Sequence, residues 1–149
     1  MMDDLRPGGF LLSQVHHLSG RVFARLLKRH GLEELNPAQG RILFVLWQND
    51  GVPISELARR TSLGKSTLTA MLDRLENDGY VVRMPSPSDR RTVLIHRTLK
   101  DEGFRRAFLA VSAEMTELWY AGLSEDERDR FEATLRRILA NLSDVGEGE

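Results

Sequence analysis

The amino-acid sequence predicts a mainly α-helical fold with a small β wing, in which a winged helix-turn-helix lies between N- and C-terminal helices. Apolar residues recur at helical spacing near both ends of the chain. Two short helical segments flank a tight turn in the middle, and two β-prone stretches follow them. The 149 residues, of which 41% are hydrophobic, suffice for a single domain with a packed core.

The first third of the chain predicts two helices. Asn36 is a suitable N-cap and Pro37 a suitable first helical residue, so a helix is expected from there through Trp47. Before it, an amphipathic helix is expected over residues 10–30, with Gly31 as its stop. Its apolar residues are spaced by three and four positions, at Leu11, Val15, Leu18, Val22 and Leu26.

The middle of the chain predicts a helix-turn-helix. Ile54–Thr61 is expected to form a short helix that buries Ile54, Leu57 and Ala58. A tight turn follows, in which Ser62 stands where many such units have glycine. The second helix is expected over Lys65–Asn77, with an apolar face made of Leu68, Met71, Leu72 and Leu75.

A β-hairpin, the wing, is expected from the stretches Tyr80–Arg83 and Thr92–His96. The loop between them is rich in turn residues and ends in two adjacent arginines. Asp89 directly precedes Arg90 and Arg91, and we expect it to orient one guanidinium by a salt bridge.

The last third predicts two more helices with apolar stripes. Thr98 and Asp101 fit a loose capping box that opens the first of them. Ser124 and Glu127 fit a second capping box at the start of the last helix. The tail Ser143–Glu149 is small and acidic, and we expect it to fray.

Charge is distributed unevenly, although the net charge is only −1. Residues 51–100 carry nine Lys/Arg and five Asp/Glu, whereas residues 101–149 carry six and twelve. A basic middle beside an acidic C-terminal third indicates a module that faces a polyanion.

Several other classes of protein lack support in the sequence. The absence of cysteine excludes disulfides, thiolate catalysis and thiolate metal sites. Apolar runs are far shorter than a membrane span and no leader pattern is seen, so we expect a soluble cytoplasmic protein. The four histidines suit neither a metal site nor a catalytic triad. We therefore expect no enzyme activity and no cofactor.

The exposed face of the second central helix carries the candidate contacts to double-stranded DNA. Short hydroxyls and free amides near a helix N-terminus suit phosphate contact and close approach to the major groove. Arginines at a hairpin tip suit the minor groove. The expected contacts are Lys65, Ser66, Thr67, Thr69 and Arg74 on the helix, and Asp89, Arg90 and Arg91 on the wing.

Two stretches together resemble the signature of the MarR family of bacterial and archaeal transcription regulators. Leu72–Val81 contains Asp-Arg-Leu-Glu, a glycine and the start of a strand, and Pro87–Arg91 ends in the Asp-Arg-Arg of the wing. In that family Leu-Thr usually closes the hairpin, with glycine three residues after the threonine. Counting from the wing places Arg97-Thr98 there, whereas counting back from Gly103 places Leu99-Lys100 there. The sequence therefore leaves the start of the fifth helix undetermined by two residues.

The resemblance implies one MarR-like domain over residues 1–149 that forms a homodimer. Residues 36–98 would be the DNA-binding part, and residues 1–35 and 99–149 the helical dimerisation part. The apolar stripes of the terminal helices support this, because a winged helix of roughly 60 residues does not need them for its own core. The resemblance further implies a sequence-specific regulator, a repressor, on an inverted-repeat operator with half-sites about one helical turn apart.

Regulators of this family often bind small anionic or aromatic effectors between the winged helix and the dimerisation helices. The resemblance therefore makes His17, Arg21 and Trp47 candidate effector contacts, with ordinary core packing as the alternative for Trp47. A second class of function is also open. The chain can instead be a protein-interaction module that uses its terminal helices and does not bind DNA.

Overall fold

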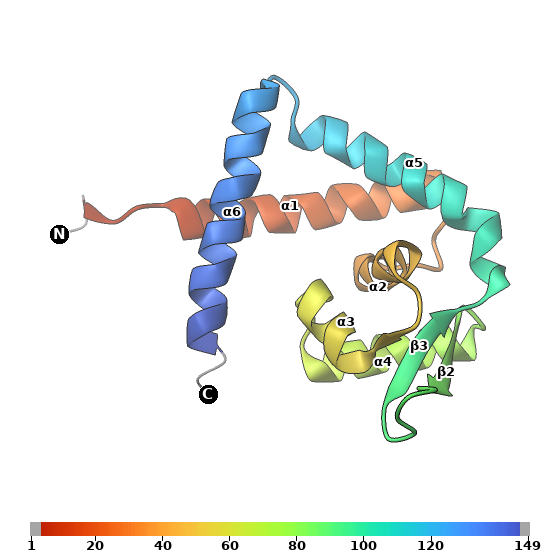
Figure 1. Cartoon of the computed structure of the whole chain (residues 1–149). Coiled ribbons are helices and arrows are strands. Elements are labelled where there is room, and N and C mark those ends of the chain that lie inside the picture. Colours follow the sequence, from red (N-terminus) through yellow and green to blue (C-terminus); the bar gives the residue numbers. More distant parts are fainter. Residues whose placement is uncertain (1–3, 147–149) are drawn as a thin grey trace. The chain divides into compact units, whose positions relative to one another are not determined.

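The computed structural model describes residues 4–146, which contain six α-helices and a three-stranded antiparallel sheet (Figure 1). The helices and strands are α1 (Gly8–Arg29), α2 (Pro37–Gln48), β1 (Val52–Pro53), α3 (Ile54–Thr61), α4 (Lys65–Asn77), β2 (Val81–Pro85), β3 (Val93–Arg97), α5 (Glu102–Trp119) and α6 (Glu125–Gly146). This order confirms the mainly helical fold with a β wing that the sequence predicts. No described helix is long and apolar enough to span a membrane.

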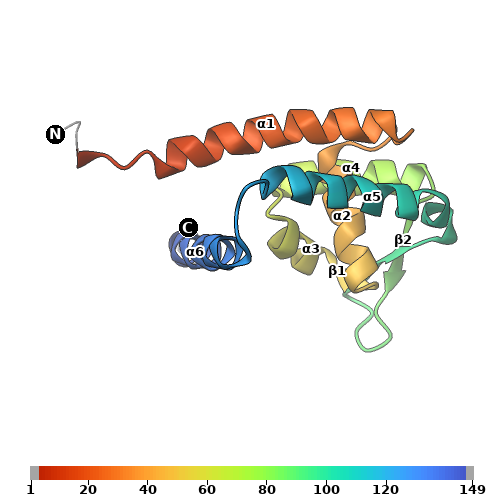
Figure 2. The same cartoon turned by 90° about the horizontal axis from the view of Figure 1, so that it is seen from above.

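The chain divides into two compact units between Ser112 and Ala113, within α5. The first unit contains the winged helix together with α1 and the first part of α5. Seen from above in Figure 2, that part of α5 crosses over α2, and α1 runs beside it. The core of this unit is formed by the fully buried residues Leu27, Ile42, Leu43, Leu46, Leu57, Leu68, Leu72, Leu75, Val81, Ile95 and Val111.

Local sequence signals account for most of the helix ends in this unit. The Asn36 side chain accepts a hydrogen bond from the Gln39 N–H at 2.8 Å, and the Gln39 side chain accepts one from the Asn36 N–H at 3.0 Å. This capping box fixes the start of α2 where the proline predicts it. Ile54 differs from expectation, since it is 36% exposed. Ile54 is the first residue of α3, whose buried face is formed by Leu57 and Thr61, and it lies at the edge of that face.

The sheet contains one strand that the sequence does not indicate. Val52–Pro53 forms β1 and pairs antiparallel with β3, with Val52 opposite Ile95, so the strand order is β1-β3-β2. A strand of two residues has no periodicity to detect. In the hairpin, Val81 lies opposite Arg97 and Pro85 opposite Val93. Each strand begins one residue later than predicted, and β2 ends two residues later and β3 one residue later.

The start of α5 corrects the predicted capping box. Thr98 caps a short 3₁₀ turn, Leu99–Asp101, by accepting a hydrogen bond from the Lys100 N–H at 3.3 Å, and α5 begins at Glu102. The Thr98 hydroxyl also donates to the carbonyl of Gly79 at 2.6 Å, which closes the hairpin. Asp101 does not complete the box, because its carboxylate is buried against other partners. The hairpin therefore ends at Arg97-Thr98, the first of the two registers.

The second unit consists of the end of α5 and α6. The capping box is confirmed there, since the Ser124 hydroxyl and the Glu127 carboxylate each accept the other residue's backbone N–H at 3.2 Å. The Phe131 ring lies 6.1 Å from that of Trp119 and 6.3 Å from that of Tyr120. The expected fraying is wrong for residues 143–146, where α6 continues to Gly146, and residues 147–149 lie outside the described part.

Both tyrosines of the chain should ionise above their ordinary pKa of about 10. Burial raises the pKa of Tyr80, and the Glu34 carboxylate, which accepts a hydrogen bond from its hydroxyl at 3.2 Å, raises it further. The hydrogen bond to Glu132 at 2.8 Å raises the pKa of Tyr120. A raised pKa in the folded state means that the stabilisation is complete below the unfolded pKa and is lost as pH rises through the folded value.

Ultraviolet absorbance of tyrosinate, followed with pH in the folded and unfolded protein, measures these pKa values. In a Tyr120→Phe variant the signal belongs to Tyr80 alone. An unchanged Tyr80 pKa on folding would contradict the contact with Glu34.

Candidate nucleic-acid interface

Helix α4 presents a polar face away from the core. Its N-cap is Gly64, which has no side chain to satisfy the first N–H groups of the helix. Lys65, Ser66 and Thr67 are exposed in this first turn. Free amides, a cation and short hydroxyls therefore lie together at the positive end of the helix dipole, an arrangement that suits a phosphate.

The remaining candidates on α4 are also exposed. The Thr69 hydroxyl donates to the carbonyl of Lys65 at 2.9 Å, which leaves its lone pairs available as acceptors. Arg74 lies in the last turn and is exposed. All five predicted α4 residues thus lie outside the buried face formed by Leu68, Leu72 and Leu75.

The turn between α3 and α4 contains a left-handed residue. Ser62 has φ 55° and follows Thr61, whose hydroxyl donates to the carbonyl of Leu57 at 2.5 Å. The position thus has the backbone conformation that favours glycine in other helix-turn-helix units, although a serine occupies it.

Replacing Ser62 with glycine should therefore stabilise the protein. The left-handed conformation costs an L-residue about 1–2 kcal/mol, and glycine avoids this cost. Glycine loses more backbone entropy on folding, which offsets about 0.5–1 kcal/mol of that gain. The expected net stabilisation is therefore about 0.5 kcal/mol. Ser62 is exposed, so the change removes no core contact. Urea denaturation of Ser62→Gly beside Ser62→Ala measures the gain, and equal midpoints for the two variants would contradict it.

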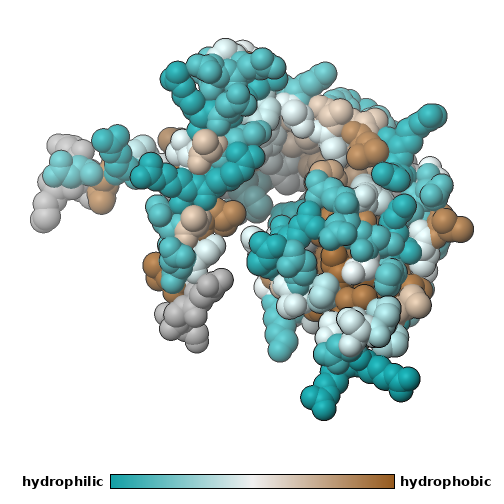
Figure 3. Space-filling model, in the orientation of Figure 1, coloured by the Kyte–Doolittle hydropathy of each residue, from teal (hydrophilic) through white to brown (hydrophobic). Residues whose placement is uncertain are grey.

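The wing tip is ordered by short polar side chains. Asp89 accepts hydrogen bonds from the backbone N–H of Arg91 at 3.0 Å and from the Thr92 hydroxyl at 3.4 Å. The contacts found for Asp89 thus go to the backbone of Arg91 and to a hydroxyl, which differs from the expected salt bridge to a guanidinium. Arg90 and Arg91 are exposed, and Figure 3 shows hydrophilic side chains projecting from the wing tip.

An ion pair that the sequence does not indicate connects the wing to α4. The Arg83 guanidinium on β2 lies 2.8 Å from a carboxylate oxygen of Asp73 and 3.7 Å from one of Glu76. The two acids are three residues apart on α4, so one arginine spans both. Their spacing was visible in the sequence, but the partner on another element was not. These ion pairs connect β2 to the helix that carries the polar face.

The three candidate effector residues have different surroundings. Trp47 donates its indole N–H to Asp101 at 2.6 Å, and its ring lies 5.0 Å from the ring of Phe108 on α5. These contacts favour the packing alternative for Trp47. His17 and Arg21 are exposed on α1. No group of three His, Asp or Glu side chains among the described residues is placed to hold a metal ion.

Comparisons with known proteins agree with this geometry. The family model described as "MarR family" matches residues 35–93 of this chain. The transcriptional regulator TtmR of Methylorubrum extorquens is 36% identical over 91% of this chain, and this chain spans 64% of its length. A mutant MarR from Escherichia coli in complex with operator DNA has a TM-score of 0.78 and 26% identity, with 93% of this chain and 98% of that chain covered.

A ligand-bound structure is similar as well. CouR from Rhodococcus jostii RHA1, bound to p-coumaroyl-CoA, has a TM-score of 0.77 and 27% identity, with 87% of this chain and 90% of that chain covered. These two structures cover 93% and 87% of this chain, so the similarity in fold includes the winged helix and the terminal helices. Residues 35–93 therefore carry a MarR-family domain, and the chain has the fold of MarR-family transcription regulators.

Proposed function

We propose that this chain is a homodimeric repressor that binds an inverted-repeat operator in double-stranded DNA and is released from it by a small-molecule effector. DNA binding is inferred from two exposed surfaces that belong to the same unit. The polar face of α4 and the arginines of the wing tip are both exposed, and the Arg83 ion pairs connect their elements. The operator complex of the similar MarR mutant supports this reading.

In this proposal α4 enters the major groove and the wing contacts the adjacent minor groove. Lys65 and the free amides at the start of α4 bind a phosphate, while Ser66, Thr67, Thr69 and Arg74 face the base edges. Arg90 and Arg91 enter the minor groove, where a narrow groove concentrates negative potential. Asp89 contributes by ordering the wing-tip backbone.

Exposed apolar residues support the homodimer. On α1 they include Phe10 at 69%, Leu11 at 52% and Leu18 at 57% exposure. No described residue of α6 is buried, and its exposed large apolar side chains are Ile138, Leu139, Leu142 and Val145. In Figure 3 apolar side chains gather toward the C-terminal end of α6. A second copy would cover such faces by a two-fold interface, which places the two α4 helices for half-sites about one helical turn apart.

An effector would act by shifting the population of dimers. A ligand that binds better to a dimer with misplaced α4 helices lowers operator affinity in proportion to that preference. The exposed His17 and Arg21 offer donors and charge for an anionic or aromatic molecule, and the p-coumaroyl-CoA bound to CouR supports ligand binding in this fold. Trp47 remains a candidate as the wall of such a site.

Fluorescence anisotropy with the protein's own upstream intergenic duplex, beside a scrambled duplex, tests the proposal across a salt series. We expect saturation at one dimer per site and a logarithmic salt slope of about −0.9 for each neutralised phosphate. Equal weak binding to both duplexes would place the operator elsewhere. Absence of binding even at low salt, together with salt-insensitive binding to a protein, would favour the protein-interaction module instead.

A further inference from the structure

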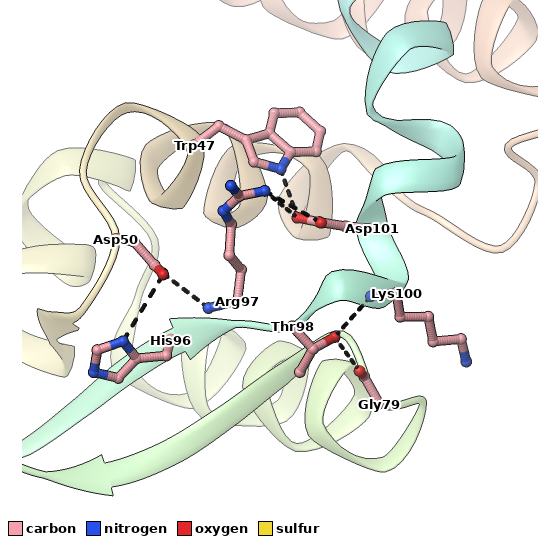
Figure 4. A network of polar contacts seen from close by, with 8 residues as sticks. All are labelled: Trp47, Asp50, Gly79, His96, Arg97, Thr98, Lys100 and Asp101. Carbon is pink, nitrogen blue, oxygen red and sulfur yellow. Dashed lines mark hydrogen bonds and ion pairs between the residues drawn. The ribbon is translucent and has the colours of Figure 1, made fainter.

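A buried polar cluster lies where the wing meets α5, away from the candidate DNA contacts (Figure 4). Asp101, at the end of the 3₁₀ turn, is 0% exposed. One of its carboxylate oxygens accepts the indole N–H of Trp47 at 2.6 Å, and the other lies 3.3 Å from the Arg97 guanidinium. A single carboxylate thus joins the end of α2, the end of β3 and the start of α5.

The chemistry of the cluster favours a geometric role over a stabilising one. A buried carboxylate is unfavourable unless its charge is paired and hydrogen-bonded, and here Arg97 and Trp47 do both. Apolar residues of similar volume are often as stable as a buried ion pair. The Trp47–Asp101 hydrogen bond of 2.6 Å, however, is short and directional, and the longer Arg97 contact of 3.3 Å places the opposite charge beside it, so together they orient the segments that carry them.

A second carboxylate, that of Asp50, also connects the end of β3 to the end of α2. The backbone N–H of Arg97 donates to an Asp50 carboxylate oxygen at 2.8 Å, and the His96 imidazole lies 3.8 Å from the other oxygen. Asp50 follows the last turn of α2. The carboxylates of Asp50 and Asp101 therefore fix the base of the wing on two sides (Figure 4).

This chain departs from the family pattern at these positions. The hairpin ends at Arg97-Thr98, so Arg97 stands where the pattern has leucine, and Asp101, three residues after Thr98, stands where it has glycine. Both departures are charged, and the two side chains contact each other. An ion pair thus occupies the two positions at which the family pattern has leucine and glycine.

We propose that the Arg97–Asp101 pair, together with Trp47, sets the direction in which α5 leaves the wing. A further anchor of the first part of α5 is the Phe108 ring, which meets the rings of Trp47 and Phe23 edge-on. A Cβ at Gly40 would lie 2.8 Å from that ring, so the ring lies directly against α2. Apolar contact alone is not directional, and the polar anchor at Asp101 supplies the second point that defines the helix axis.

The consequence for DNA binding rests on the proposed function. Helix α5 continues into the second unit, which in the proposed dimer contacts the other copy. Its direction then determines how far apart the two α4 helices lie, and so which half-site spacing they fit. Arg97 and Asp101 are positioning residues in this scheme, since neither touches DNA.

Spin-label distances test the direction of α5 without DNA. The chain lacks cysteine, so Asn77→Cys on α4 and Ala110→Cys on α5, both at exposed positions of the first unit, take a label each. Dilution with unlabelled chain isolates the distance within one chain. We expect one narrow distance distribution with the native residues, and a shifted or broadened one in Asp101→Asn and in Arg97→Met.

Asp101→Asn keeps the size of the side chain and an acceptor for Trp47, so it remains informative if Arg97→Met fails to fold. The matched control is Asp126→Asn, which removes an exposed Arg130–Asp126 pair of 3.0 Å at the same spacing and should leave the distribution unchanged. Unchanged distributions in both cluster variants, with only a lower melting temperature, would overturn the proposal.

Operator spacing supplies a second readout. Duplexes selected from a random pool by the native protein are lengthened or shortened by one base pair between half-sites. We expect Asp101→Asn to lose about tenfold in affinity for the selected spacing and much less for the altered spacings, because a less fixed helix direction flattens the preference. An unchanged spacing profile overturns this consequence. Failure of the native protein to select any duplex overturns the proposed function, while the spin-label result still decides the direction of α5.

Discussion

Replacing Leu11 and Leu18 with glutamate should convert the dimer into monomers and lower operator affinity by about 100-fold or more, the loss expected when two linked half-site contacts become independent. The two leucines are seven residues apart on one face of α1, and they are 52% and 57% exposed in the single chain. Two carboxylates buried in an apolar interface would be unpaired charges, which an interface does not tolerate. Sedimentation velocity measures the mass, and anisotropy with the selected operator measures the affinity.

Ser13→Glu is the matched control for this variant. Ser13 lies on the same exposed helix, on the face opposite the apolar stripe, so it adds one charge without entering the interface. The control should remain dimeric and keep its affinity. A dimeric Leu11→Glu/Leu18→Glu variant would show that the copies associate through another surface.

Local chemistry explains why so much of the fold could be predicted from the sequence. Helix starts follow from side chains that satisfy their own backbone, as Asn36 does for α2 and Ser124 for α6. The helix-turn-helix could be placed because its apolar spacing and its break lie within one short segment. The exposure of the candidate residues on α4 followed from the same spacing, since the apolar positions of that helix form its buried face.

The features that escaped prediction depend on partners far along the chain. Strand β1 exists because Val52 pairs with Ile95, and nothing near Val52 indicates it. Asp101 fitted a capping box by spacing, but the Trp47 indole and the Arg97 guanidinium attract its carboxylate into the interior. The ion pair between Arg83 and Asp73 likewise joins two elements. Polar side chains with alternative partners are decided by tertiary structure, which local patterns do not contain.

Replacing Arg90 and Arg91 together with alanine should lower operator affinity by about 100-fold at moderate salt, because each guanidinium that contacts DNA contributes roughly 1–3 kcal/mol. Both arginines are exposed at a tip whose backbone Asp89 orders through hydrogen bonds, so the substitutions remove charge without affecting the fold. The salt slope should become shallower by about 1 for each phosphate contact that is lost. Anisotropy across a salt series measures both quantities.

Arg130→Ala is the control for general loss of positive charge, since Arg130 is 80% exposed on α6 and distant in sequence from the wing. Arg130→Ala changes the net charge by one without removing a proposed DNA contact. Its effect on operator affinity should be small, because salt screens long-range charge effects beyond a Debye length of about 8–10 Å. The two quantities also separate the kinds of contact that the wing can make. A lower affinity with an unchanged salt slope would mean that the arginines read the groove without neutralising phosphates. Unchanged affinity and slope would mean that α4 alone carries recognition and that the wing stays outside the minor groove.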